Sequence, residues 1–389
     1  MAKRTNGEGT IKKRANGTWE AQYTVYENGE RKRRSVYGKT KGEVSAKLGD
    51  IVKTIRDGDY IAPNALTVKG WMYEWLKNYL LKARESTKYQ YEQYFRLYVL
   101  PVIGDKPIQD VTALMIQNII AGKLRDGLSA KTVRNLHSIL HHCFQDAADM
   151  EIITKNPVVK KKERLPKADK KEMLILEGET LEQFISEIQG KEFEELFFVD
   201  MFTGMREGEI LGLSWDCVDF KNQSITIKQQ LKRDSHIGEK NSQYIKDDTK
   251  TGNTRTIYPA AAVFTTLKRV KRKQQENQLR NGSRFYNPWN LVFTDEIGHW
   301  INGRTLLKAF KKRVTVIGLP EMRFHDLRHT YAAISIQNGD DLYTVSKNLG
   351  HTTISTTANV YGHLTHKAKK DSANRMDGFI NGLKASGND

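Results

Sequence analysis

RFHDLRHTYAAISIQNGDDLYTVSKNLGHTTISTTANVY, residues 323–361, is the stretch around which the rest of the chain is organised. His325 and Arg328 lie three residues apart, so they share one face of a helix. His351 follows in the sequence LGH, and Tyr361 comes ten residues after it. An arginine, two imidazoles and a phenol can together bind a phosphate and attack it. The stretch therefore predicts a site for phosphoryl transfer.

A second motif, TGMREGEILGL at residues 203–213, adds Arg206 and, three residues later, Glu209. Taken alone, a His-x-x-Arg pattern is usually a pair on a helix surface. The order of these residues along the chain is more specific than any one of them. It resembles the Arg…Lys…His-x-x-Arg…His…Tyr signature of the tyrosine recombinases, the DNA integrase family.

The resemblance implies a catalytic set in this chain. Its members are Arg206, Lys250, His325, Arg328, His351 and Tyr361. Lys250 is matched by its place in KTGNTRTI, with Lys246 as the alternative, and Glu209 is expected to orient Arg206. Two further imidazoles lie near the motif. We expect His329 and His363 to pack or to contact the DNA backbone rather than to take part in the chemistry.

The residue types suit cleavage of a phosphodiester. A guanidinium can bind two phosphate oxygens in a planar fork, and an imidazole can donate to them or carry a proton near neutral pH. A phenol has an ordinary pKa of about 10, so it needs cationic neighbours to become a nucleophile. A lysine can protonate the leaving 5′ oxygen.

The resemblance also implies a mechanism. Tyr361 forms a covalent 3′-phosphotyrosyl link and releases a 5′-hydroxyl, which conserves the energy of the phosphodiester bond. We therefore expect no ATP, metal or other cofactor. Four protomers are expected to act in pairs through a Holliday junction. The expected partners are double-stranded DNA at core and arm sites, three further copies of the chain, and an excision factor or DNA-bending protein.

The composition agrees with a nucleic-acid partner. The 389 residues include 63 Lys and Arg against 46 Asp and Glu, a formal charge of +17. An RNA-binding protein can be equally basic, so charge alone does not select DNA. Cys143 and Cys217 indicate neither a disulfide framework nor a metal site. With no long apolar span and no signal-peptide pattern, a membrane location is disfavoured and we expect the protein in the cytoplasm.

The first 58 residues read as a small sheet and one helix. Asn16-Gly17 and Asn28-Gly29 are turn signals between β-prone runs, and residues 44–55 have helical spacing of apolar side chains. The segment resembles the arm-type DNA-binding domain of phage and conjugative-transposon integrases. Its candidate DNA contacts are Lys12, Arg14, Arg31 and Arg33. Residues 59–67 read as a linker.

Residues 68–157 are predicted to be helical throughout and resemble the core-binding domain of the same family. Ser86-Thr87, Thr112 and Ser129 are predicted to begin helices, and the helix after Thr87 is expected to end before Pro101. The candidate DNA contacts are Lys88, Arg96, Lys131 and Arg134. Residues 158–172 read as a flexible basic linker, in which Lys161 is a further candidate.

Residues 173–389 predict a mixed, mainly helical catalytic domain with a small antiparallel sheet. Runs at 224–231 and 254–259 are expected to pair around a long polar turn, and NLVFT at 290–294 to add a strand. Arg255 is a candidate DNA contact. A terminal apolar stripe predicts an exchange helix that packs either on its own domain or on a neighbouring protomer: Met376, Phe379, Ile380 and Leu383.

The predicted fold class is thus multidomain α+β, and the function that the resemblance implies is site-specific integration and excision of a mobile element. A type IB-like topoisomerase shares the chemistry but needs no second sequence-specific site, which the N-terminal sheet domain implies. An Xer-like resolving recombinase usually lacks that domain. A non-catalytic DNA-binding regulator would not need the complete catalytic set.

Overall fold

The computed structural model describes residues 10–27, 30–57, 60–61, 65–159, 165–167, 173–233, 244–248, 254–362 and 376–377. Several residues with expected roles lie outside these ranges: Lys161, Lys250, His363, Phe379, Ile380 and Leu383. The chain divides into two compact units, Met1–Lys170 and Lys171–Asp389. The mainly helical build with small antiparallel sheets confirms the predicted α+β fold class.

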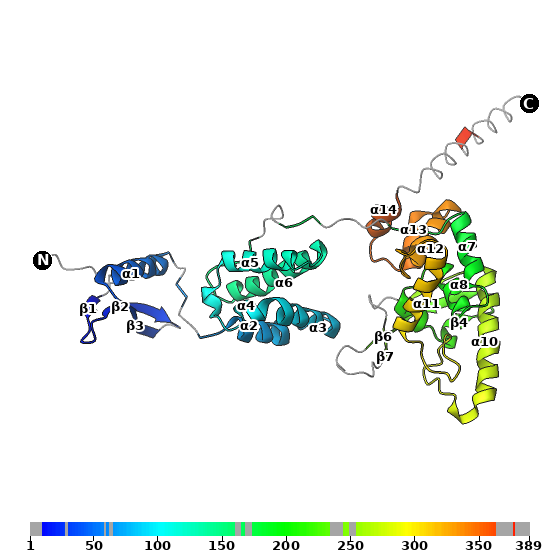
Figure 1. Cartoon of the computed structure of the whole chain (residues 1–389), viewed down its shortest axis with the longest axis horizontal. Helices are drawn as coiled ribbons and strands as arrows, with labels where there is room; N and C mark the ends of the chain where they lie inside the picture. Colours follow the sequence, from blue (N-terminus) through cyan, green and yellow to red (C-terminus); the bar gives the residue numbers. More distant parts are fainter. Residues whose placement is uncertain are drawn as a thin grey trace, which may run out of the picture. The chain divides into compact units, whose positions relative to one another are not determined.

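The first unit begins with a three-stranded antiparallel sheet in the order β1-β2-β3, followed by one helix (Figure 1). The elements are β1 Thr10–Lys13, β2 Trp19–Glu27, β3 Glu30–Gly38 and α1 Lys41–Arg56. Ala21, Tyr23 and Val25 of β2 are buried with Val44 and Leu48 of α1, as the period of two along the strand predicts. The alternate residues of the strands therefore form a sheet face that the helix does not cover.

The rest of this unit is a helical bundle around a core that contains Trp71, Trp75 and Phe144. Thr112 and Ser129 cap their helices as predicted. The N-cap residue of α3 is Arg84, whereas Ser86-Thr87 was expected to begin this helix. The helix end expected before Pro101 was wrong, because η2 and α4 follow α3 without a break and Pro101 is the second residue of α4. The elements are α2 Val68–Glu74, η1 Trp75–Tyr79, α3 Glu85–Tyr94, η2 Phe95–Val99, α4 Leu100–Ile103, η3 Ile108–Asp110, α5 Ala113–Arg125 and α6 Ala130–Asp149.

The second unit packs its helices around a large apolar core, with Phe184, Phe197, Phe310 and Phe324 in mutual ring contact. Its helices are α7 Glu179–Ile188, α8 Glu194–Met201, α9 Glu207–Leu211, η5 Trp215–Cys217, α10 Ala261–Asn281, η6 Gly282–Arg284, α11 Gly303–Val316, α12 Asp326–Gln337, α13 Leu342–Leu349 and α14 Ile354–Tyr361.

The sheet structure of this unit differs from the prediction. The run at 224–231 is two strands, because β5 Ser224–Ile227 pairs with β4 Val218–Asp219 and β8 Arg255–Ile257, whereas β6 Gln229–Arg233 pairs with β7 Tyr244–Asp248. The polar turn thus supplies a strand of its own. NLVFT makes only isolated bridges, Ser214 to Leu291 and Thr294 to Trp300, so the strand predicted there was wrong.

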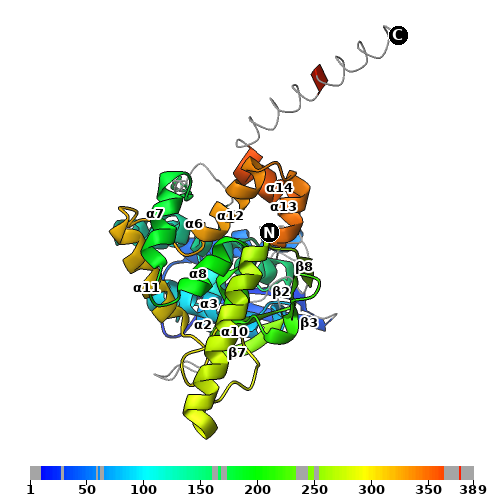
Figure 2. The same cartoon turned by 90° about the vertical axis from the view of Figure 1, so that its right-hand side faces the viewer.

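Helices α12, α13 and α14 gather at one end of the second unit in both views (Figures 1 and 2). A small apolar cluster joins them, with Ile336 from α12, Val345 and Leu349 from α13, and Tyr361 from α14. The sequence motif at 323–361 is therefore one packed group of three short helices.

Candidate functional site

The C-terminal end of α13 is the centre of the site. Three successive carbonyl oxygens at this end each accept a hydrogen bond from a different arginine. Arg255 Nε donates to Asn348 O at 2.7 Å, Arg328 Nη2 to Leu349 O at 2.5 Å, and Arg206 Nη2 to Gly350 O at 3.1 Å. These carbonyls have no partner within the helix, and the negative end of its dipole favours cations. Residues 348–350 at the end of α13 therefore order three guanidinium groups.

Arg206 is the N-cap residue of α9, with extended backbone angles. Its N–H donates to Glu209 Oε2 at 3.0 Å and its Nη1 to Glu209 Oε1 at 2.7 Å. A quarter of its side chain is exposed. The spacing of three residues seen in the sequence is thus a capping arrangement that holds the guanidinium against Glu209.

Arg328 is anchored more deeply. Nη1 donates to Gly204 O at 2.7 Å, and only 2% of the residue is exposed. Burial and the charge of Arg206 lower the pKa of Arg328 to about 9, which leaves it charged at neutral pH. Gly204 has φ +62°, and a Cβ there would lie 2.5 Å from Tyr331, so glycine is required at the turn before Arg206.

Arg255, a candidate DNA contact, is paired within the protein. Nη1 and Nη2 donate to the two oxygens of Glu209 at 3.1 and 2.6 Å, and 10% of the side chain is exposed. Burial alone would raise the pKa of Glu209, yet the hydrogen bond and charge of Arg255, followed by those of Arg206, lower it to about 2. Glu209 is therefore an ionised carboxylate between two arginines.

The expected imidazoles lie beside these arginines. His325 is the N-cap residue of α12 and is the more exposed of the two, and partial burial together with the charge of Arg328 lowers its pKa. His351 follows α13, and its Nδ1 lies 2.8 Å from Thr357 Oγ1. Burial and then the charges of Arg328, Arg206 and Arg255 lower the pKa of His351 to about 4. Both imidazoles are thus kept neutral by their surroundings.

Tyr361 is 1% exposed, and its hydroxyl lies 2.5 Å from Nδ1 of His329. Burial raises the pKa of the Tyr361 phenol, with Arg328 acting in the opposite direction. Burial and the neighbouring His325 lower the pKa of His329 to about 4, so the neutral ring can accept a hydrogen bond from the phenol, which keeps its proton. The sequence did not predict this contact, because no spacing rule relates residues 32 positions apart.

A buried carboxyl group beneath the site was also missed. Asp200 of α8 is 1% exposed, and neither of its carboxylate oxygens has a hydrogen-bond partner among the described residues. Burial raises the pKa of Asp200 well above its ordinary range, whereas Arg328 lowers it. Nothing in the apolar run ELFFVDMF distinguishes this aspartate from one at the surface.

The other described candidate DNA contacts belong to the first unit. On the sheet, Lys12 and Arg14 lie 3.5 and 3.7 Å from Glu20, and Arg31 and Arg33 are exposed on β3. In the helical bundle, Lys88 and Arg96 bind Glu85 and Gln93, while Lys131 is exposed and Arg134 is half-buried on α6.

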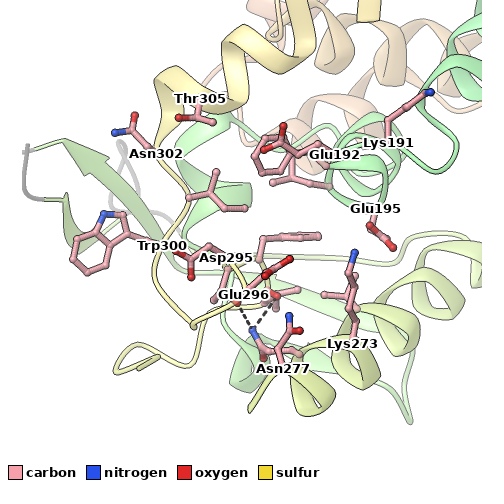
Figure 3. Close-up of a pocket in the computed structure, with 18 residues that line it drawn as sticks. Lys191, Glu192, Glu195, Lys273, Asn277, Asp295, Glu296, Trp300, Asn302 and Thr305 are labelled. Carbon is pink, nitrogen blue, oxygen red and sulfur yellow. Dashed lines mark hydrogen bonds between the residues drawn. The ribbon is translucent and has the colours of Figure 1, made fainter. Parts of the chain in front are cut away.

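A cavity of about 490 Å³ lies elsewhere in the second unit, between α8, α10 and the segment at 292–305 (Figure 3). Its labelled polar residues carry both signs of charge, with Lys191 and Lys273 near Glu195 and Glu296 (Figure 3). None of the arginines or imidazoles described above lines this cavity, so it is not part of the site.

Comparison with known proteins identifies the family. The phage integrase family model matches residues 176–368, and the N-terminal SAM-like domain of phage integrases matches residues 67–124. A tyrosine recombinase XerC-like protein of Caldanaerobacter subterraneus subsp. tengcongensis is 32% identical over 364 residues, covering 90% of this chain and 93% of that protein. The chain belongs to the phage integrase family of tyrosine recombinases. It is therefore a DNA strand-cleaving and rejoining enzyme, a site-specific recombinase of the integrase type.

Other relatives agree with this assignment. The ICEBs1 integrase of Bacillus subtilis is 29% identical over 78% of this chain and 81% of that protein. The Tn1549 transposon integrase bound to transposon right end DNA has the same fold, with a TM-score of 0.68 at 23% identity over 80% of this chain and 99% of that chain. A lambda integrase tetramer bound to a Holliday junction matches with a TM-score of 0.53 at 16% identity, over 88% and 95% of the two chains. Among the described helices of the recombinase, none has the length and apolar character needed to cross a membrane.

Proposed function

We propose that this recombinase integrates and excises a mobile element by using Tyr361 as the nucleophile on a DNA phosphate held by Arg206 and Arg328. The observation that carries the proposal is the convergence of three arginines, two neutral imidazoles and the Tyr361 segment at the end of α13. Fixed cations aimed at a phosphate stabilise the charge that develops on its equatorial oxygens.

The remaining roles follow from the chemistry of each group. His325 and His351, neutral at pH 7, can donate one hydrogen bond to a phosphate oxygen and relay a proton. Lys250, which lies outside the described residues, is proposed to protonate the leaving 5′ oxygen, with Lys246 as the alternative. Glu209 orients Arg206 through two hydrogen bonds.

The buried state of Tyr361 adds a condition. A phenol with 1% exposure and a histidine partner cannot reach a DNA phosphate, so α14 must shift before attack. We propose that the described arrangement is the resting form and that DNA binding releases the hydroxyl from His329. A Holliday-junction pathway with four protomers, and an excision factor or bending protein, complete the proposed assembly in the cytoplasm.

The domain division supports an integrase with two classes of DNA site. We propose residues 1–58 as the arm-binding domain, 59–67 as a linker, 68–157 as the core-binding domain, 158–172 as a basic linker and 173–389 as the catalytic domain. Lys12, Arg31 and Arg33 lie on the sheet face that α1 leaves uncovered. Lys12 is paired across the strands with Glu20, and Arg33 with Thr24, and Glu20 and Thr24 alternate with the buried residues of β2. This face suits an arm site on DNA.

Replacing Tyr361 with Phe tests the function directly. We expect the variant to bind DNA as the wild type does and to form no covalent adduct, because only the phenolic oxygen is removed. A nicked suicide duplex analysed on a denaturing gel gives the answer. An adduct formed by the Phe variant would exclude Tyr361 as the nucleophile.

A further inference from the structure

Arg255 occupies a junction between three segments that are far apart in the sequence. Its guanidinium binds both oxygens of Glu209 on α9, and its Nε donates to Asn348 O at the end of α13. The residue itself begins β8, where it pairs with Ile227 of β5. One side chain therefore joins β8, α9 and α13.

Pairing of the whole guanidinium with protein acceptors, rather than burial, argues against a direct role of Arg255 in DNA binding, since Arg328 is buried more deeply and is proposed to hold the phosphate. The side chain of Arg255 is 10% exposed and that of Glu209 is 1% exposed, and all three guanidinium nitrogens of Arg255 have protein acceptors. A buried carboxylate needs a charged partner with good geometry, and a bidentate guanidinium supplies it. Arg206 offers Glu209 one guanidinium nitrogen and one backbone N–H, so most of the compensation comes from Arg255.

Charge sharing has a consequence for Arg206. If Glu209 were paired with Arg206 alone, the carboxylate would neutralise the guanidinium that faces the substrate. With Arg255 present, the group formed by the two arginines and the one carboxylate carries a net positive charge. Arg206 therefore keeps an attractive potential toward a phosphate.

The contact with α13 also fixes the position of His351. Gly350 has φ +66°, and a Cβ built there would lie 2.8 Å from Arg255 Nη1. Arg206 donates to the carbonyl of this same glycine, and Arg255 donates to the carbonyl of Asn348, two residues earlier. His351 follows immediately, so its backbone is held by the same two arginines.

We propose that Arg255 is a positioning residue of the strand-cleavage site, which holds α9 and the end of α13 in one frame so that Arg206 and His351 face the same phosphate. The inference rests on the proposed function of that site. Arg255 does not touch the substrate; it acts through Glu209 and through the carbonyl of Asn348.

The test uses the full chain and a matched control. Arg255→Lys keeps the charge but loses the bidentate fork. Arg255→Ala leaves a space that added methylguanidinium can fill. Arg313→Lys is the control, because the side chain of Arg313 is 12% exposed, close to that of Arg255, and pairs with Glu187 at 2.7 Å in the same unit, outside the site. The substrate is a nicked duplex copied from the joined ends of the mobile element that carries the gene.

At saturating DNA we expect Arg255→Lys to form the covalent adduct about 10- to 100-fold more slowly, because small displacements of catalytic groups have effects of this size. Its DNA affinity and the salt dependence of that affinity should match the wild type. Methylguanidinium should restore part of the rate of Arg255→Ala, and Arg313→Lys should remain within twofold of wild type. In DNA-free protein, backbone amides at 349–353 should exchange with deuterium faster in Arg255→Lys than in Arg313→Lys.

Three results would overturn the proposal. Arg255→Lys could cleave as fast as wild type, or lose about one unit of salt slope at an unchanged saturated rate, which is the behaviour of a phosphate contact. Arg313→Lys could lose as much activity as Arg255→Lys, which would indicate general destabilisation. A wild-type protein that forms no adduct would instead refute the proposed function, and the exchange measurement would then still decide whether Arg255 holds α13.

Discussion

Individual side chains in this recombinase are held by partners that lie far away in the sequence. Arg328 donates to carbonyls 124 and 21 positions away, and Arg206 to one 144 positions away. Each bond uses only part of a guanidinium with five N–H donors, so donors remain for a phosphate. The arginines are therefore oriented before DNA arrives, which is the condition for strong electrostatic stabilisation of a transition state.

Arg206→Lys should keep the fold and the charge yet lose most of the strand cleavage. A lysine cannot bind Glu209 and Gly350 O while offering a fork to phosphate. Loss of one donor to the transition state typically costs about 10²–10³ in rate. Single-turnover adduct formation measures the loss, with DNA affinity as the control. Cleavage close to the wild-type rate would show that Arg206 has only a structural role.

His351 gives a prediction on the pH dependence of stability. Its pKa falls to about 4 on folding, from the ordinary value of about 6.5, so the unfolded chain binds more protons between these values. The free energy of unfolding should therefore decrease as the pH falls from 6.5 toward 4. His351→Asn retains a group that can contact Thr357 Oγ1 but does not titrate. Urea unfolding at several pH values should show a smaller decrease for this variant, and parallel curves would contradict the assignment.

At the level of secondary-structure elements, close backbone packing positions the short helices. α9 lies against β6, and Gly212 at the end of α9 makes this possible. A Cβ at Gly212 would lie 2.5 Å from the backbone nitrogen of Leu231 and 2.7 Å from the carbonyl carbon of Gln230. Backbone atoms cannot rotate away as a side chain can, so α9 and the Arg206 that caps it depend on this glycine.

Gly212→Ala should lower the free energy of unfolding by about 1–3 kcal/mol, the usual cost of overpacking. Gly122→Ala in α5 is the matched control, because a Cβ there meets no atom within 4 Å. That variant should be neutral or more stable by up to about 1 kcal/mol, since alanine favours a helix interior. Chemical unfolding of both variants decides the matter, and equal stabilities would show that β6 moves aside without cost.

At the level of the whole molecule, separate hydrophobic clusters support separate DNA-binding roles. The cluster formed by the N-terminal sheet and α1 shares no residue with that of the helical bundle or those of the catalytic unit. A segment with its own core can be removed without opening a cavity in the others. This separation is the physical basis for proposing that the sheet binds arm sites and that the second unit cleaves DNA.

Deletion of residues 1–58 should leave cleavage of a core site intact and abolish binding to a distant arm site. Footprints on the element ends, with and without the segment, provide the measurement. Full-length protein with Lys12, Arg31 and Arg33 changed to Gln is the finer control, because it keeps the sheet and removes only the charges. It should lose the distant footprint and about one unit of salt slope per phosphate contact. An unchanged footprint in either protein would rule out arm binding.

The sequence by itself determined the family, the α+β class and the order of the candidate catalytic residues. The family and the catalytic order came from resemblance to a known signature, whereas local rules were sufficient for several elements: the period of two in β2, the caps at Thr112 and Ser129, and the three-residue spacing of Arg206 and Glu209 depend on neighbours within a few positions. The two-strand division of residues 224–231 could not be read in this way, because it depends on which partner strand each half meets.

Only the tertiary structure decided which partners each cation of the site has and how deeply it is buried. Arg255 looks like any basic residue in a polar turn, yet burial beside Glu209 makes it part of the core of the site. His329 and Asp200 likewise acquire their roles from contacts across helices. The same holds for Tyr361, whose hydroxyl is buried against His329. The physical reason is that desolvation and pairing depend on distance in space, and residues far apart in the chain meet only after the helices pack.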